Sequence, residues 1–173
     1  MKSKWSITVL GTIAAMGLQA CASFQPLYGT NGLEQSQVVS DLSDIHIPPA
    51  KERVGQLIRN NLISTMSPPG QEGSGRYQLI IQPASNDFDV TVERNTDVSR
   101  RSYRLKVQYA LRDSQSGQRI YTGKTFSEVN YDKVTSEFTN LQARNNARER
   151  AALEVSRDIR IRLSAFFASR GNS

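Results

Sequence analysis

Residues 103–112 have the sequence YRLKVQYALR, in which large apolar residues alternate with polar, charged or small ones. A period of two places Tyr103, Leu105 and Val107 on one face of a β-strand and Arg104 and Lys106 on the other. One face is therefore expected to be buried and the other to face water, as in an antiparallel sheet covered on one side. We therefore interpret the neighbouring segments as elements that pair with this strand or cover its apolar face.

Flanking segments repeat the alternation or change to a helical period. Val54, Leu57, Ile58 and Leu62 recur at helical spacing before a Ser-Pro-Pro-Gly stop at residues 67–70. We expect further strands at residues 42–47, 77–82, 88–93 and 120–129, with hairpin connections at 95–97 and 113–117.

A long terminal helix is expected from about residue 136 to residue 168. Its apolar stripe comprises Leu141, Ala152, Val155, Ile159, Leu163 and Phe166. The element order predicts an α+β two-layer sandwich. In it, two helices pack on one face of a four- to five-stranded, mostly antiparallel sheet.

The amino terminus has the pattern of an export signal. Lys2 and Lys4 precede an apolar segment at residues 5–18, which is shorter than the roughly 20 residues of a spanning helix. Leu18-Gln19-Ala20-Cys21 then resembles the lipobox of bacterial lipoproteins, in which the cysteine is lipidated after cleavage; the alternative is an ordinary signal peptide with a stray cysteine. The predicted organisation is a signal peptide (1–20), a lipidated tether (21–40), one domain (41–169) and a tail (170–173).

Composition narrows the classes of function. The 173 residues carry a net charge of +6, one cysteine and one histidine. A single thiol and a single imidazole, His46, argue against a disulfide framework, a typical metal centre and a nucleophile–base pair. We therefore expect no enzyme activity, no cofactor and no metal. The basic charge alone would also suit nucleic acid, but the export signal argues against it.

Basic residues concentrate around one expected hairpin. Residues 94–112 contain six Arg or Lys and one acid, Asp97. Such a row can grip phosphate groups. It can equally be a solvated strand face, or a charged edge that blocks unwanted strand pairing.

Two segments resemble the LptE family of lipopolysaccharide-assembly lipoproteins. Residues 24–29, FQPLYG, follow the lipobox cysteine closely, as the similar opening of that family does. The terminal helix, with Ser136-Glu137-Phe138 and the later run at 147–152, is similar to the family's closing helix. Ala22 stands where the family usually has glycine.

The resemblance implies a non-catalytic lipoprotein on the periplasmic side of the outer membrane, anchored through Cys21. It would plug a large LptD-type β-barrel, assist its assembly and bind lipopolysaccharide. A generic envelope lipoprotein that scaffolds another periplasmic complex is the alternative. Arg94 is the closest positional match to the family's basic lipid contacts. Charge patterning adds four residues to this candidate lipopolysaccharide site: Arg100, Arg101, Arg104 and Lys106.

Overall fold

The computed structural model describes residues 32–67, 75–91 and 99–171. The expected signal peptide, Cys21 and the turn that carries Arg94 lie outside these ranges. The described elements are α2 (Gly32–Ser43), β1 (Ile45–His46), α3 (Arg53–Met66), β2 (Tyr77–Thr91), β3 (Ser99–Asp113), β4 (Arg119–Lys133) and α4 (Glu137–Gly171).

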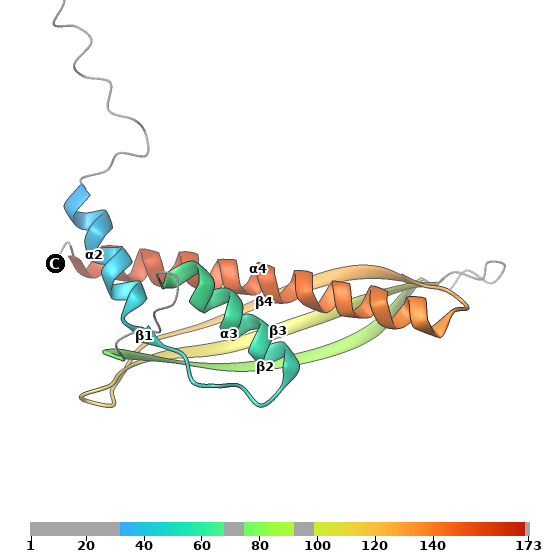
Figure 1. Cartoon of the computed structure of the whole chain (residues 1–173), viewed down its shortest axis with the longest axis horizontal. Helices are drawn as coiled ribbons and strands as arrows, with labels where there is room; N and C mark the ends of the chain where they lie inside the picture. Colours follow the sequence, from blue (N-terminus) through green and yellow to red (C-terminus); the bar gives the residue numbers. More distant parts are fainter. Residues whose placement is uncertain (1–31, 68–74, 92–98, 172–173) are drawn as a thin grey trace, which may run out of the picture. The chain divides into compact units, whose positions relative to one another are not determined.

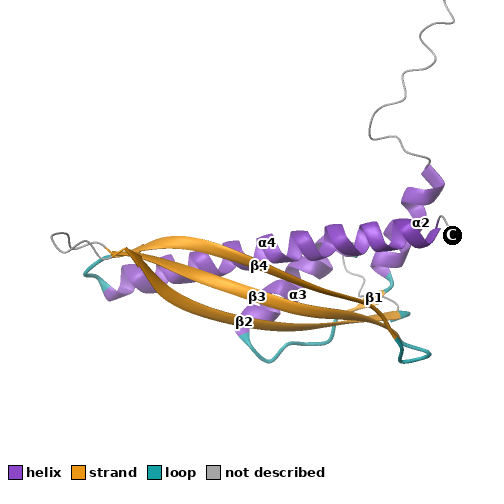
Figure 2. Cartoon of the chain, turned by 180° about the vertical axis from the view of Figure 1, so that it is seen from behind, coloured by secondary structure: helices purple, strands orange, loops and turns teal. Residues whose placement is uncertain are grey.

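The strands form one mixed sheet in the order β1-β2-β3-β4. β1 pairs in parallel with the first two residues of β2, and the three long strands pair antiparallel. β3 is thus the central long strand, and β4 is an edge strand. Figure 2 shows the long strands lying across one side of α3 and α4.

β2 corrects an expectation, because residues 77–91 form one continuous strand where two were predicted. The two expected strands, at residues 77–82 and 88–93, leave a gap that begins at Pro83. Beyond Gln78, however, β2 has no described strand on its outer side. A proline is tolerated on such an edge because no neighbouring strand needs its missing N–H.

The helices α3 and α4 cover one face of the sheet, which confirms the expected α+β sandwich (Figure 1). Alternate residues of β3 pack beneath them, and Leu105 and Leu111 are completely buried. Ser156 of α4 donates its hydroxyl to the carbonyl of Ala152 at 2.6 Å, and its Oγ lies 3.4 Å from the carbonyl oxygen of Ile58 in α3. The buried side of α4 comprises Asn140, Ala147, Ala151, Ala152, Val155, Ser156, Ile159, Leu163 and Phe167.

Two ends of the domain differ from expectation. Leu141 was placed on the buried stripe of the last helix but is 53% exposed, because that stripe begins effectively at Ala147. Residues 32–40, interpreted as tether, belong to α2, an element that the sequence did not predict. α2 contributes Leu42 to the core, and Asp41 lies 3.6 Å from Arg76 at the start of β2.

Candidate functional site

The second face of the sheet carries the candidate basic residues. We call it the open face, because no helix in the described part of the chain covers it (Figure 2). Strand register places alternate residues of β3 on it, and each has cross-strand neighbours on β2 and β4. Its β3 members are Arg100, Ser102, Arg104, Lys106, Gln108, Ala110 and Arg112. The expected row of Arg100, Arg104, Lys106 and Arg112 therefore shares one face, as the alternation indicated.

The arginines nearest the β2–β3 hairpin are already paired with carboxylates. Arg104 contacts Glu128 of β4 at 2.8 Å, and Ser102 donates to the same carboxylate at 3.0 Å. Arg100 lies 3.5 Å from Asp132. The hydrogen bonds from Arg104 and Ser102 hold the pKa of Glu128 below its usual value. An anionic ligand would have to share Arg100 and Arg104 with these internal partners.

Aromatic side chains lie among the cations of the open face. The guanidinium of Arg104 lies 4.6 Å from the ring centre of Phe88 on β2, within cation–π range. Lys106 is directly opposite Phe126 of β4, which is 69% exposed. This face therefore offers positive charge and apolar surface together, the combination that an acylated, phosphorylated molecule requires. Sequence reasoning missed both phenylalanines; Phe126 could have been found from the alternation of β4.

Lys106 is the most available of the candidate cations. It is exposed, and no ion pair to it is found among the described residues. Arg101, by contrast, has the opposite parity in β3, and its Nε lies 2.8 Å from Asp89. The structure thus separates Arg101 from the open face on which the other described candidates lie.

A polar cluster on the helix-covered side ties α4 to the sheet. Asp87 of β2 accepts two hydrogen bonds from Arg144 of α4, at 2.9 and 2.6 Å, and one from the Tyr131 hydroxyl at 2.9 Å. Burial acts to raise the pKa of Asp87, but these hydrogen bonds and the charges of Arg144 and Arg101 outweigh it and lower the pKa. Arg144, which interrupts the apolar stripe of the helix, therefore has a structural role.

No group of three or more potential metal ligands occurs in the described residues. None of the helices there combines the length and apolar character of a membrane span.

The domain matches a known protein family. A family model described as LptE, lipopolysaccharide-assembly, matches residues 42–163, from the end of α2 to the last buried turns of α4. The chain belongs to the LptE family. This range includes the complete sheet and α3, so the LptE assignment applies to the domain that bears the open face.

Three solved structures are similar to the chain to different degrees. A candidate lipoprotein from Caulobacter crescentus CB15 superposes with a TM-score of 0.64 at 26% identity, over 78% of this chain and 98% of that one. A minor lipoprotein from Acinetobacter baumannii has 13% identity and a TM-score of 0.49, over 70% of this chain and 88% of that one. Rare lipoprotein B from Shewanella oneidensis has 14% identity and a TM-score of 0.37, over 74% and 94%.

No curated protein matches the chain by sequence. The family match describes this LptE member as a protein of lipopolysaccharide assembly, and the Caulobacter structure has a similar fold.

Proposed function

We propose that the protein is a non-catalytic subunit of the outer-membrane lipopolysaccharide transport complex, that it plugs and helps to assemble an LptD-type β-barrel, and that it binds lipopolysaccharide on its open face. The family match over residues 42–163 carries this proposal. The cations, the exposed ring of Phe126 and the half-buried ring of Phe88 on the open face support the lipid-binding part.

The proposed anchor is Cys21. Each buried methylene of an acyl chain contributes about 0.8 kcal/mol, so an amino terminus with several chains is held firmly where a single chain would exchange. Residues 22–31 would connect this anchor to α2. The absence of aspartate directly after the cysteine favours the outer membrane over the inner one.

Basic and aromatic side chains would contact different parts of lipopolysaccharide. Four basic residues would pair with phosphates of lipid A and the core: Lys106, Arg104, Arg100 and Arg94, the last of which lies outside the described residues. Arg101 points to the opposite side of β3 and pairs with Asp89, so it is not part of this proposed contact surface. Phe88 and Phe126 would contact acyl chains. Because these contacts keep apolar surface away from water, they lower the free energy needed to remove a lipid from its aggregate. Binding would therefore both recognise the headgroup and disrupt lipid packing.

Charge reversal at Arg94 and Lys106 together is expected to weaken binding of lipopolysaccharide roughly tenfold, because two attractive phosphate contacts become repulsive. Binding is measured by titrating fluorescently labelled lipopolysaccharide into the full-length protein. The matched control reverses two exposed residues, Lys51 in the segment before α3 and Arg157 of α4. Equal affinities of the two double variants would exclude the open face as the site.

The barrel partnership is tested separately. A detergent extract containing the full-length tagged protein should yield a large outer-membrane β-barrel in near-stoichiometric amount, since a plug inside a barrel dissociates slowly. Recovery is measured by mass spectrometry of the purified complex. Recovery of other envelope proteins without a barrel would instead indicate a scaffolding lipoprotein.

A further inference from the structure

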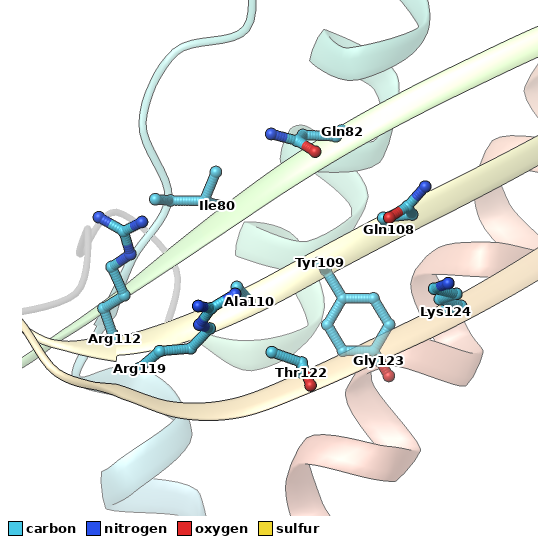
Figure 3. A pocket seen from close by; sticks show the side chains of 10 residues that line it. All are labelled: Ile80, Gln82, Gln108, Tyr109, Ala110, Arg112, Arg119, Thr122, Gly123 and Lys124. Atoms are coloured by element: carbon cyan, nitrogen blue, oxygen red, sulfur yellow. The ribbon is translucent and has the colours of Figure 1, made fainter.

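A second cationic region lies on the open face, at the end remote from the β2–β3 hairpin. The sheet there is hollowed by a cavity of about 520 Å³ (Figure 3). Arg112 of β3 and Arg119 of β4 border one end of this hollow, and Lys124 of β4 borders the other. Ile80, Ala110 and Thr122 lie between them, and Gln82 and Gln108 are in the same cross-strand row as Lys124.

A β-bulge brings the two arginines together. The register between β3 and β4 shifts after Leu111, so that Arg112 pairs with Arg119 and Ile120 is the extra residue. Without the bulge, strict alternation from Tyr121 would put Ile120 on the open face and Arg119 on the other. Instead Ile120 packs against the core, and Arg119 lines the hollow beside Arg112. Bulges commonly re-aim side chains at binding sites.

The two arginines of this hollow have no carboxylate partner among the described residues, whereas Lys124 also borders a second hollow that Glu154 and Asp158 line. No carboxylate lines the cavity, and among the described residues no ion pair to Arg112, Arg119 or Lys124 is found. The nearest acid along the chain, Asp113, accepts hydrogen bonds from Ser116 and Gln115 within the β3–β4 turn. Two like charges directly opposite each other across strands destabilise a sheet.

Protection of a sheet edge does not explain this arrangement. Lys and Arg commonly block edge strands, and Arg119 and Lys124 are on an edge. Arg112, however, is on the central strand β3, paired on both sides. A bound anion would offset the repulsion between the two arginines and use the polar groups around them.

We propose that this hollow binds phosphate groups. The two guanidinium forks suit bidentate contacts with phosphate oxygens, and Lys124 supplies a third charge at the far end of the hollow. The hydroxyl of Thr122 and the amides of Gln82 and Gln108 can donate further hydrogen bonds. The site is separate from the lipopolysaccharide contacts proposed above, whose described cations lie nearer the hairpin. The phosphate can belong to a lipid headgroup or to a soluble molecule.

The test titrates full-length protein in a non-ionic detergent with three probes: inorganic pyrophosphate, dihexanoyl phosphatidylglycerol and zwitterionic dihexanoyl phosphatidylcholine. Calorimetry gives the affinity, and amide chemical shifts locate the site. We expect saturable pyrophosphate binding with shifts centred on residues 108–112 and 119–124. Arg112→Gln combined with Arg119→Gln should raise the Kd at least tenfold. Lys51→Gln combined with Arg157→Gln removes the same charge elsewhere and should change the Kd less than twofold.

Each outcome decides the proposal. If the unaltered protein binds both pyrophosphate and phosphatidylglycerol, and only the Arg112/Arg119 variant loses both, the ligand is a lipid headgroup. If the unaltered protein binds pyrophosphate but not phosphatidylglycerol, and only that variant loses pyrophosphate binding, the ligand is a soluble phosphorylated molecule. No saturable binding, or equal loss in the control, overturns the site. If the double variant does not fold, Lys124→Gln, at an exposed position, should still raise the Kd severalfold, and an unchanged Kd there also overturns it. Because Arg94 and Lys106 are untouched, lipopolysaccharide binding through them can succeed or fail independently.

Discussion

Replacing Leu105 with alanine is expected to lower the free energy of unfolding by about 3 kcal/mol, the largest effect anticipated for any single substitution considered for this chain. Leu105 is completely buried on the central strand, beneath the helix layer. Truncation removes its apolar contacts and leaves a cavity that helices on one side and paired strands on the other cannot readily close. Equilibrium urea unfolding, followed by circular dichroism, measures the change.

The adjacent residue provides the matched control. Lys106 belongs to the same strand but points to the open face and is exposed. Lys106→Ala should change stability by less than about 0.5 kcal/mol. Similar losses for the two substitutions would contradict the assignment of opposite faces to neighbouring residues of β3.

Replacing Asp87 with asparagine is expected to cost about 2 kcal/mol at neutral pH. The Asp87 side chain is 11% exposed and accepts hydrogen bonds from both Arg144 and Tyr131. Asparagine keeps the shape but removes the negative charge, so Arg144 loses its charged partner where α4 meets β2. Half of the Arg144 side chain remains near water, which keeps the loss below that of a fully buried ion pair.

The same pair makes stability depend on pH. Because the folded pKa of Asp87 lies below its unfolded value near 4, its contribution is fully present above that value and is lost as pH falls through the folded pKa. Between about pH 2 and 6, the free energy of unfolding should therefore change less with pH for Asp87→Asn than for the unaltered protein. Urea unfolding at a series of pH values measures this dependence. Asp113 and Glu128, whose pKa values are also lowered, should supply the slope that remains.

A surface ion pair serves as the control for Asp87. Asp158 contacts Arg162 at 2.8 Å one turn along α4, with both side chains well exposed. Asp158→Asn should cost no more than about 0.5 kcal/mol, because water and salt screen such pairs. If the two substitutions lower the free energy of unfolding equally, the Asp87–Arg144 pair between β2 and α4 stabilises the fold no more than a surface ion pair does.

Much of the fold could be predicted because local periodicity reports directly on burial. The alternation at residues 103–112 correctly predicted which side chains of β3 face the helices. Spacing of 3.6 residues correctly predicted α3 and the later part of α4. Pro83 and Leu141 show where this reasoning ends. Whether a proline is tolerated depends on which strand edge has a neighbour, and whether a leucine is buried depends on where the helix meets the sheet.

The candidate site, like the fold, could be predicted only in part from the sequence. Parity alone placed Arg104 and Lys106 together on the solvent side, and the register supports this. Parity could not show that Arg104 is shared with Glu128, which lies 24 positions away in the sequence. Nor could it place Arg119, because the bulge that turns it toward Arg112 inserts one residue into an otherwise regular strand.

The sequence by itself therefore determined the α+β class, the two faces of the central strand and the family resemblance, and it predicts a lipid anchor at Cys21. These are local properties, set by the spacing of side chains along a few residues. Only the tertiary structure decided which cations are neutralised, which remain available around the hollow, and why Arg144 interrupts an apolar stripe. The physical reason is that ion pairs and cavities form between residues that strand pairing and helix packing bring together from distant positions, and charge alone does not specify the partner.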